Sequence, residues 1–374
     1  MALLITAFLG GAALTPASAS DSLDQSLYAW IRDRQDPKTG LVPSYSGDPA
    51  LEGVAFTYDQ ALAVHVFCAF GDLDRAKRVI AFFERAERSE NLYYTAYDSK
   101  TGSVWEYNVH TGPNAWIGMA ALRVARLAKS RPTQALAAVL GDALARLQDA
   151  EGGLPGGPGI TWYSTEHQLD AYAFFDALQA ETGNPVYAKT RDAVLAWLRQ
   201  NAFDPATSEV RRGKNDAVLA CDTYSWSVAA LGPSVLQKAG MDARAVMQRA
   251  EDLCRVTVTA GGKEISGFDF TDAAAIRRPA VVSTEWTAQA ALSWRIAGDP
   301  DRASAYLDAI APLVSGSALP YASAPSAETG HGWKTPAGEK TGSVAGTAYF
   351  LLARKGCNPF DPDARLPRAQ NVGK

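Results

Sequence analysis

Six segments of the chain open in the same way, and the spacing between them constrains the fold more than any other feature. Each begins with a small or polar residue that suits a helix N-terminus and continues as a run of small and apolar residues. A helix of this composition must be buried on most sides. The segments begin at Thr57, Asn114, Thr165, Thr223, Thr284 and Gly342, so their starts lie 57, 51, 58, 61 and 58 residues apart. A regular period of this size predicts a repeat architecture.

More polar helices are predicted between these segments. They carry apolar residues at helical spacing with charges between them, which is typical of a helix that buries one face. The expected outer helices cover 22–34, 72–88, 133–148, 185–200, 242–254 and 300–313. Twelve helices that alternate between inner and outer positions predict an all-α (α/α)6 toroid, a closed ring of six helical hairpins. The alternative is an open solenoid, whose repeats are usually shorter, at about 33–47 residues.

The connections that lead into the inner helices are long, whereas those that lead out of them are short. The long connections cover 35–56, 91–113, 149–164, 202–222, 256–283 and 315–341, far beyond the usual length of a helix connection. They should therefore gather at one rim, above the N-termini of the inner helices. Long loops on a rigid scaffold commonly carry function.

Aromatic residues are concentrated in these loops and in the first turns of the inner helices. Six of the nine tryptophans lie there, namely Trp105, Trp116, Trp162, Trp226, Trp286 and Trp333, together with Tyr58, Tyr107, Tyr163, Tyr224 and Tyr321. Aromatic faces pack against the C–H faces of sugar rings, so this collection favours a glycan-binding cleft. The alternative is that these side chains pack the loops onto the barrel.

Acidic residues occur at the same level of the predicted ring. They are Asp59, Glu106, Glu166, Asp170, Asp222 and Glu285. Each alone could be a first-turn acid that is stabilised by the helix dipole. Together they should converge on one rim, where the proximity of like charges raises the pKa of some of them.

A pair of carboxyl groups across a cleft is what glycoside hydrolysis requires: one protonates the leaving oxygen, and the other activates water or attacks the sugar. We expect Glu166 to be the proton donor, because Trp162, Tyr163 and His167 surround it in sequence and an apolar wall raises the pKa of a carboxyl group. Asp59, Asp222 and Glu285 remain the candidates for the second catalytic role.

The expected substrate-binding residues come from the same loops and helix starts. They are Tyr58, Glu106, His110, Asn114, Trp116, Trp162, Tyr163, His167, Asp170, Tyr224, Trp226, Trp286, Gln289 and Trp333. Three of the four histidines, His110, His167 and His331, belong to the rim. They lack the HxH and HExxH spacings of metal sites, so we predict neither a metal nor another cofactor. His65 lies in an apolar helix and is expected to be a satisfied core residue.

The first residues suggest a processing segment. Leu3 to Leu14 form an apolar run too short to span a bilayer comfortably, and Ala17-Ser18-Ala19 resembles a signal-peptide cleavage site, although no basic residue precedes the run. We predict a signal peptide at 1–19, a single catalytic domain at 20–374, and a periplasmic or secreted location. A buried N-terminal helix is the alternative.

The net charge restricts the classes of partner that the protein can bind, and the four cysteines leave a disulfide open. The net charge of −4 gives no excess of basic residues for binding nucleic acid, and no later segment is long and apolar enough to span a membrane. The expected partner is a carbohydrate substrate, and we expect the protein to be a monomer. Cys221 and Cys254 could pair in an oxidising compartment, but four free buried thiols are equally compatible with the sequence.

The repeated helix starts and the rim of tryptophan, tyrosine and acidic residues resemble the six-hairpin glycosidases over 21–357. The closest segments are 57–60 (TYDQ), 164–170 (STEHQLD) and 283–287 (STEWT). The resemblance implies a glycoside hydrolase acting on a poly- or oligosaccharide such as an exopolysaccharide or glucan. The same clan also contains lyases, phosphorylases and epimerases. A polysaccharide lyase, using His110, Tyr163 and Arg211-Arg212, is therefore one alternative, and a non-catalytic glycan-binding protein of the cell envelope is another.

Overall fold

A computed structural model of the chain describes residues 19–338 and 340–361. The expected signal peptide at 1–19 lies outside these residues except for Ala19, and the end of the predicted domain, 362–374, also lies outside them. Among the described helices, none combines the length and the apolar composition that a bilayer crossing requires.

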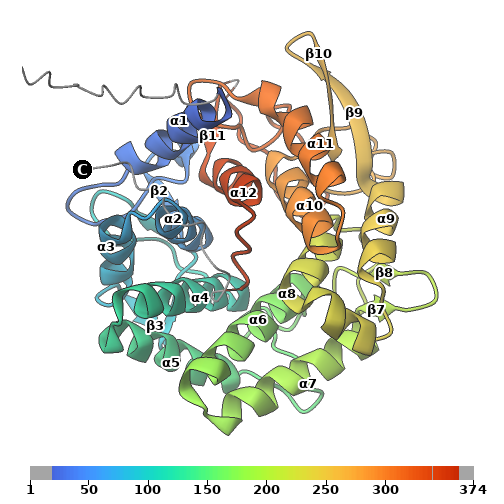
Figure 1. Cartoon of the computed structure of the whole chain (residues 1–374). Coiled ribbons are helices and arrows are strands. Elements are labelled where there is room, and N and C mark those ends of the chain that lie inside the picture. Colours follow the sequence, from blue (N-terminus) through green and yellow to red (C-terminus); the bar gives the residue numbers. More distant parts are fainter. Residues whose placement is uncertain (1–18, 339, 362–374) are drawn as a thin grey trace, which may run out of the picture.

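Twelve helices of the described chain form two concentric rings (Figure 1). The inner helices are α2 (Thr57–Ala69), α4 (Thr111–Ala128), α6 (Thr165–Thr182), α8 (Asp222–Lys238), α10 (Thr284–Ile296) and α12 (Val344–Lys355). The outer helices are α1 (Ala19–Asp33), α3 (Leu73–Phe83), α5 (Arg131–Ala145), α7 (Pro185–Asn201), α9 (Ala243–Cys254) and α11 (Pro300–Ile310). Each inner helix contacts the next one, and α12 contacts α2. The ring is closed, so the predicted toroid is confirmed and the open solenoid is excluded.

The long loops contain short antiparallel strands. In the first two loops, β2 (Val54–Phe56), β5 (Ala96–Asp98) and β6 (Val104–Glu106) form a sheet, and β3 (Arg88–Ser89) pairs with β4 (Leu92–Tyr93). Later hairpins are formed by β7 (Phe203–Asp204) with β8 (Glu209–Val210) and by β9 (Arg255–Ala260) with β10 (Lys263–Phe268). Finally, β1 (Tyr45–Ser46) pairs with β11 (Gly342–Ser343), so the first loop is also joined to the last one.

The β9–β10 hairpin is the main element that the sequence analysis did not predict. A signal for this hairpin was nevertheless present, because four consecutive β-branched residues, from Val256 to Thr259, precede a two-glycine turn. Gly261 and Gly262 both have positive φ, at 57° and 74°, which is the conformation of the two central residues of a type I′ turn.

The inner helices are attached to the rim by a hydrogen-bond pattern that repeats around the ring. The first residue of α2, Thr57, donates its backbone N–H to Thr95 O at 2.9 Å and its hydroxyl to Tyr94 O at 2.6 Å. Thr111 of α4, Thr165 of α6 and Thr284 of α10 make the same pair of bonds to consecutive carbonyls of the loop that follows their own hairpin. These threonines act as donors to the neighbouring repeat.

This arrangement corrects the interpretation of the helix starts. The residues that precede α2, α4 and α6 are Phe56, His110 and Ser164, and none of them makes a side-chain cap hydrogen bond, whereas Ser283 caps α10 by accepting from Trp286 N. In α4 the matching residue is Thr111, three positions before the expected start at Asn114. The α12 helix begins at Val344 rather than Gly342, because Gly342 belongs to β11. The backbone N–H of Val344 donates to Ser44 O at 2.9 Å and so attaches the last helix to the first loop.

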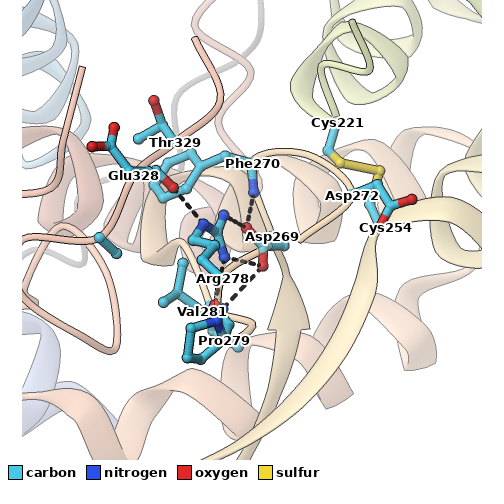
Figure 2. A network of polar contacts seen from close by, with 12 residues as sticks. Cys221, Cys254, Asp269, Phe270, Asp272, Arg278, Pro279, Val281, Glu328 and Thr329 are labelled. Carbon is cyan, nitrogen blue, oxygen red and sulfur yellow. Dashed lines mark hydrogen bonds and ion pairs between the residues drawn. A yellow bond between two sulfur atoms is a disulfide. The ribbon is translucent and has the colours of Figure 1, made fainter. Parts of the chain in front are cut away.

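A disulfide joins Cys221 to Cys254, and so ties the N-terminus of α8 to the C-terminus of α9 (Figure 2). Cys68 and Cys357 are free and buried. Of the two alternatives that the sequence left open, the structure therefore contains the pairing.

Replacing Thr165 by valine should loosen this attachment at one point of the ring. The variant keeps the shape of the side chain but leaves Arg211 O without its donor, which should lower the free energy of unfolding by about 1–2 kcal/mol. Urea denaturation followed by circular dichroism measures the change. The exposed Thr207→Val variant is the control. Equal midpoints for the two variants would show that the hydroxyl contributes nothing.

Candidate functional site

The loop-rich rim contains two chambers that meet at one wall. The inner chamber has a volume of about 220 Å³ and the outer one about 420 Å³. Glu166, His167, Trp286 and Trp333 line both chambers. The inner chamber is further lined by Tyr58, Pro113, Trp116, Asp170, Asp222, Trp226, Glu285 and Tyr321, and the outer one by Trp162, Tyr163, Ser164, Arg212, Asp216 and His331.

Four carboxyl groups reach the inner chamber because they lie in the first two turns of the inner helices. Glu166 and Asp170 come from α6, Asp222 from α8 and Glu285 from α10. Asp170, Asp222 and Glu285 are all at least 96% buried, whereas Glu166 is only partly buried. Like-charged groups in such surroundings resist simultaneous ionisation.

Glu166 and Asp222 are hydrogen-bonded to each other and titrate as a pair. Burial is the largest cause that raises the pKa of both groups. For Asp222 the neighbouring charges of Glu166 and Glu285 raise the pKa further, whereas Arg212 lowers the pKa of Glu166. The pair therefore retains a proton at a higher pH than an exposed carboxyl group would.

Glu285 is surrounded by hydrogen-bond donors. Its Oε1 accepts from Tyr58 Oη at 2.7 Å and from Gln289 Nε2 at 3.1 Å, and Tyr321 is a further partner. Burial raises the pKa of Glu285 to about 8, the hydrogen bonds from Tyr58 and Tyr321 lower it, and the charges of Asp59 and Glu166 raise it. The carboxyl group is thus poised to change its protonation near neutral pH.

Asp170 and Asp59 have different surroundings. Asp170 accepts a hydrogen bond from Trp116 Nε1 at 2.9 Å, and burial raises its pKa well above the usual value. Asp59 is buried and has a pKa raised to about 7 by desolvation, against a hydrogen bond from Ser44 that lowers it. Asp59 lines neither chamber, so of the four predicted catalytic acids it is the one set back from the space that a substrate would fill.

Tryptophans form much of the chamber walls. Trp162 and Trp333 are 49% and 39% exposed in the outer chamber, whereas Trp116, Trp226 and Trp286 are almost completely buried around the inner one. Exposed indole faces beside a cavity are suited to stacking on a sugar ring.

One side of this wall is supported by Phe270. Its ring lies 4.9 Å from the ring of Trp286 and 5.3 Å from that of Trp333, and its carbonyl oxygen lies 3.0 Å from His331 Nε2. Its N–H donates to Asp269, which forms a buried ion pair with Arg278 (Figure 2). A charge pair in the interior is stable only if its hydrogen bonds are satisfied, so this contact fixes the loop that supports the aromatic wall.

Arg278 also reaches a second loop. Its Nε donates to Glu328 O, and its Nη1 donates to Asp269 Oδ2 at 2.9 Å and to Pro279 O at 2.8 Å (Figure 2). The segments that carry Phe270 and Trp333 are therefore held together by one guanidinium group. The disulfide lies nearby, since Asp269 N donates to Cys254 O at 2.9 Å and Cys221 N to Phe270 O at 3.2 Å.

His167 lines both chambers, and its Nδ1 has no hydrogen-bond partner. Burial, aided by the nearby His110, lowers its pKa to about 3, so the ring is neutral over the ordinary pH range. His110 lies behind it, where its Nδ1 is 2.9 Å from Thr95 Oγ1 and its ring centroid is 6.0 Å from that of Trp162. Both chambers are thus lined by a neutral imidazole.

Several predicted binding residues lie away from the chambers. Asn114 donates its amide to Tyr93 O and His110 O and accepts from Tyr93 N, so it anchors a loop. Glu106 lies in β6 and accepts from Asn108. Glu106, His110, Asn114, Tyr224 and Gln289 line neither chamber, although Gln289 supports Glu285.

Other residues of the chambers were not among the predicted site residues. Arg212, Asp216, Tyr321 and His331 all line a chamber. Tyr321 and His331 were recognised as rim residues, and Arg212 as part of a basic pair, but no spacing rule distinguished them. His65 is buried, yet neither ring nitrogen has a partner, so the expectation that it is satisfied was wrong.

Among the described residues, no cluster of three or more His, Cys, Asp or Glu side chains has an arrangement that could hold a metal ion.

Comparison with known proteins identifies the fold. No protein-family model matches the chain, and no curated protein matches it in sequence. Solved structures do match. A wild-type glycosidase has a TM-score of 0.67 and 14% identity over 90% of this chain and 96% of that one. An α-amylase from Clostridium perfringens has a TM-score of 0.64 and 9% identity, over 88% and 96%. A family 76 glycoside hydrolase (mannosidase) from Bacteroides thetaiotaomicron has a TM-score of 0.61 and 12% identity, over 90% and 97%. The resemblance to the six-hairpin glycosidases is thus confirmed for the fold.

The raised pKa of Glu285 predicts a pH-dependent stability. Because the folded state binds this proton more tightly than the unfolded chain, the stabilisation is complete below about pH 4.5 and is lost as the pH rises through about 8. Glu285→Gln should remove this loss and stabilise the protein by on the order of 3 kcal/mol at pH 8. Thermal unfolding from pH 5 to 8 measures the effect. The exposed Glu264→Gln variant is the control, and parallel curves for Glu285→Gln and the wild type would refute the assignment.

Proposed function

We propose that the protein is a glycoside hydrolase that cleaves a poly- or oligosaccharide where its two chambers meet. The observation that carries this proposal is the position of Glu166, which lines both chambers and has Glu285 within the same inner chamber. Two carboxyl groups with raised pKa values, in a space walled by tryptophans, meet the requirements of glycosidic bond cleavage. The structural neighbours with this fold are described as glycosidases, an α-amylase and a mannosidase, which supports the same reaction class.

In the proposed mechanism, one sugar ring fills the inner chamber and the leaving group extends into the outer chamber. Glu166 transfers its proton to the glycosidic oxygen as the bond to the anomeric carbon breaks. Burial favours the protonated form of Glu166 before the reaction, because it raises the pKa of this group against the hydrogen bond with Asp222 and the charge of Arg212, which lower it. The partly exposed Trp162 and Trp333 offer stacking surfaces for the departing sugar.

Glu285 acts in its ionised form. It either takes a proton from the water that attacks the anomeric carbon, or it attacks that carbon itself as the nucleophile. Tyr58 and Gln289 donate hydrogen bonds to the carboxylate and so favour the ionised form. Asp59 affects this step only through its charge, because it lines neither chamber. The proposal therefore assigns the two catalytic roles to Glu166 and Glu285.

We also propose that the protein is exported to the periplasm or secreted. The apolar run from Leu3 to Leu14, followed by Ala17-Ser18-Ala19, supports export. The Cys221–Cys254 disulfide gives independent support, since such bonds persist mainly in oxidising compartments.

Hydrolysis and the catalytic assignment can be tested together. Incubation of the wild type with a panel of glycans, followed by a reducing-end assay and mass spectrometry, should give products with the mass of one added water. On the best substrate, Glu166→Gln and Glu285→Gln should each lower kcat about 10²–10⁴-fold, because each removes a proton-transfer or nucleophilic group. Asp59→Asn should retain activity within about tenfold.

The same experiment distinguishes the alternatives. Unsaturated uronate products would indicate a lyase. Glycan binding without turnover, retained in Glu166→Gln, would indicate a binding protein. Full activity in both glutamine variants would show that the catalytic residues lie elsewhere.

Tyr58→Phe tests the role of Glu285. The variant removes a hydrogen bond that lowers the pKa of Glu285, so that pKa should rise. If Glu285 must be ionised, the acid limb of the kcat/KM profile moves to higher pH. A shift of the alkaline limb would instead identify Glu285 as the proton donor. The control is Tyr94→Phe, because Tyr94 lines neither chamber. An unshifted pH profile for Tyr58→Phe would show that Glu285 is neither the group that must be ionised nor the proton donor.

A further inference from the structure

Phe360, from the end of the described chain, packs beneath two tryptophans that form the floor of the inner chamber. Trp116 and Trp226 line the chamber from α4 and α8. The ring of Phe360 lies beneath them, with its centroid 4.8 Å from that of Trp116 and 5.6 Å from that of Trp226. Phe360 is only 4% exposed although it follows the last helix, so it is a full member of the core.

The segment that carries Phe360 enters the axis of the ring. It reverses direction after α12 at Gly356, which has a φ of 65°, and Figure 1 shows it running from α12 into the middle of the toroid. Asn358 Nδ2 then donates to Ala229 O of α8 at 2.8 Å. The segment is thus attached to a helix on another side of the ring.

A buried arginine holds the segment from the opposite side. Arg123 of α4 is 1% exposed, and its Nη2 donates to Asn358 O at 2.9 Å and to Asp361 O at 2.6 Å. Burial of a guanidinium group is costly unless its donors are used, and Nη2 supplies both of these bonds, whereas Nε and Nη1 of Arg123 are buried without a partner. These two bonds therefore give Arg123 and the segment a fixed mutual position, with Phe360 between the two anchored carbonyls.

Phe360 also separates two cavities. A cavity of about 500 Å³ opens on its other side and is lined by Gly232, Asn358 and Phe360, among others. Trp116 and Trp226 line the inner chamber and contact the ring of Phe360. Phe360 and, above it, Trp116 and Trp226 thus lie between this cavity and the candidate active site.

The position of Trp116 matters for the chamber, because its Nε1 donates to Asp170 Oδ1 at 2.9 Å. Any tilt of the indole would move the donor that orients this carboxyl group. Phe360 packs against the same indole, and so can act on Asp170 through it without touching a substrate.

We propose that Phe360 is a positioning residue of the candidate active site, which closes the axis of the toroid and holds Trp116 in the orientation that binds Asp170. The effect on turnover rests on the proposed hydrolase function, whereas the closure of the axis does not. Each part therefore has its own measurement.

Phe360→Ala should leave a space beneath Trp116 and Trp226 that is continuous with the opposite cavity. Hydroxyl-radical footprinting with mass spectrometry should show at least threefold faster oxidation of Trp116 and Trp226. On a substrate of the wild type, kcat should fall at least tenfold and the pH profile should shift, because Trp116 is then no longer held in the orientation in which it donates to Asp170. Benzene, which fills apolar cavities of this kind, should restore part of the lost kcat. Phe360→Leu should retain most of the wild-type kcat, because leucine fills most of the space of the ring.

Phe175→Ala is the matched control, since Phe175 is fully buried but packs against Phe174 and Tyr187, away from the axis. It should lower stability without accelerated oxidation of the two tryptophans and without rescue by benzene. If Phe360→Ala does not fold, Phe360→Val compared with Phe175→Val gives the same two readouts, because valine also removes the aromatic ring but leaves a smaller space.

Unchanged oxidation and unchanged kcat in Phe360→Ala would overturn the proposal. Faster oxidation with an unchanged kcat and pH profile would overturn the positioning role. If the wild type hydrolyses no glycan, the proposed function fails, and the oxidation of Trp116 and Trp226 then decides by itself whether Phe360 closes the axis.

Discussion

The hydrogen-bond pair made by one threonine at the start of an inner helix is the interaction on which the rim depends. In α2, α4, α6 and α10 this residue gives both its N–H and its hydroxyl to consecutive carbonyls of the following loop. The helix N-terminus thereby satisfies donors that would otherwise be unpaired, and the loop gains a fixed position. Because each of these bonds leads to the next repeat, the orientation of the loop depends on the neighbouring helix at these four positions of the ring.

The same attachment explains why acidic groups gather in the inner chamber. The residue directly after the attached threonine lines the inner chamber in α2, α6 and α10, where it is Tyr58, Glu166 and Glu285. Burial then raises the pKa of these groups, at a cost in stability when they ionise. An inner wall of small and apolar residues can tolerate this cost because the ring of helices is otherwise closely packed. Reactive sites commonly combine such local instability with a rigid surrounding scaffold.

The period of the helix starts was sufficient to predict the closed ring and to bring Glu166 and Glu285 to one rim. It could not separate residues that face the chamber from residues that face the loops, because both lie one turn into a helix. Asn114 illustrates this limit, since its amide is used entirely by the backbone of the preceding loop. Arg212 and Phe360 were beyond reach for another reason: their positions depend on how a loop and a chain end fold back, and no local period records that.

The location of Phe360 has a consequence for the order in which the protein is completed. A chain made from its N-terminus acquires its acidic residues one hairpin at a time, from α2 to α10. The strand that joins the last loop to the first, β11, and the aromatic side chain beneath the chamber come only after residue 341. The pocket therefore cannot take its final shape before residue 360 has been synthesised, and until then the nascent chain carries the acidic residues of the chamber without the aromatic ring that supports it.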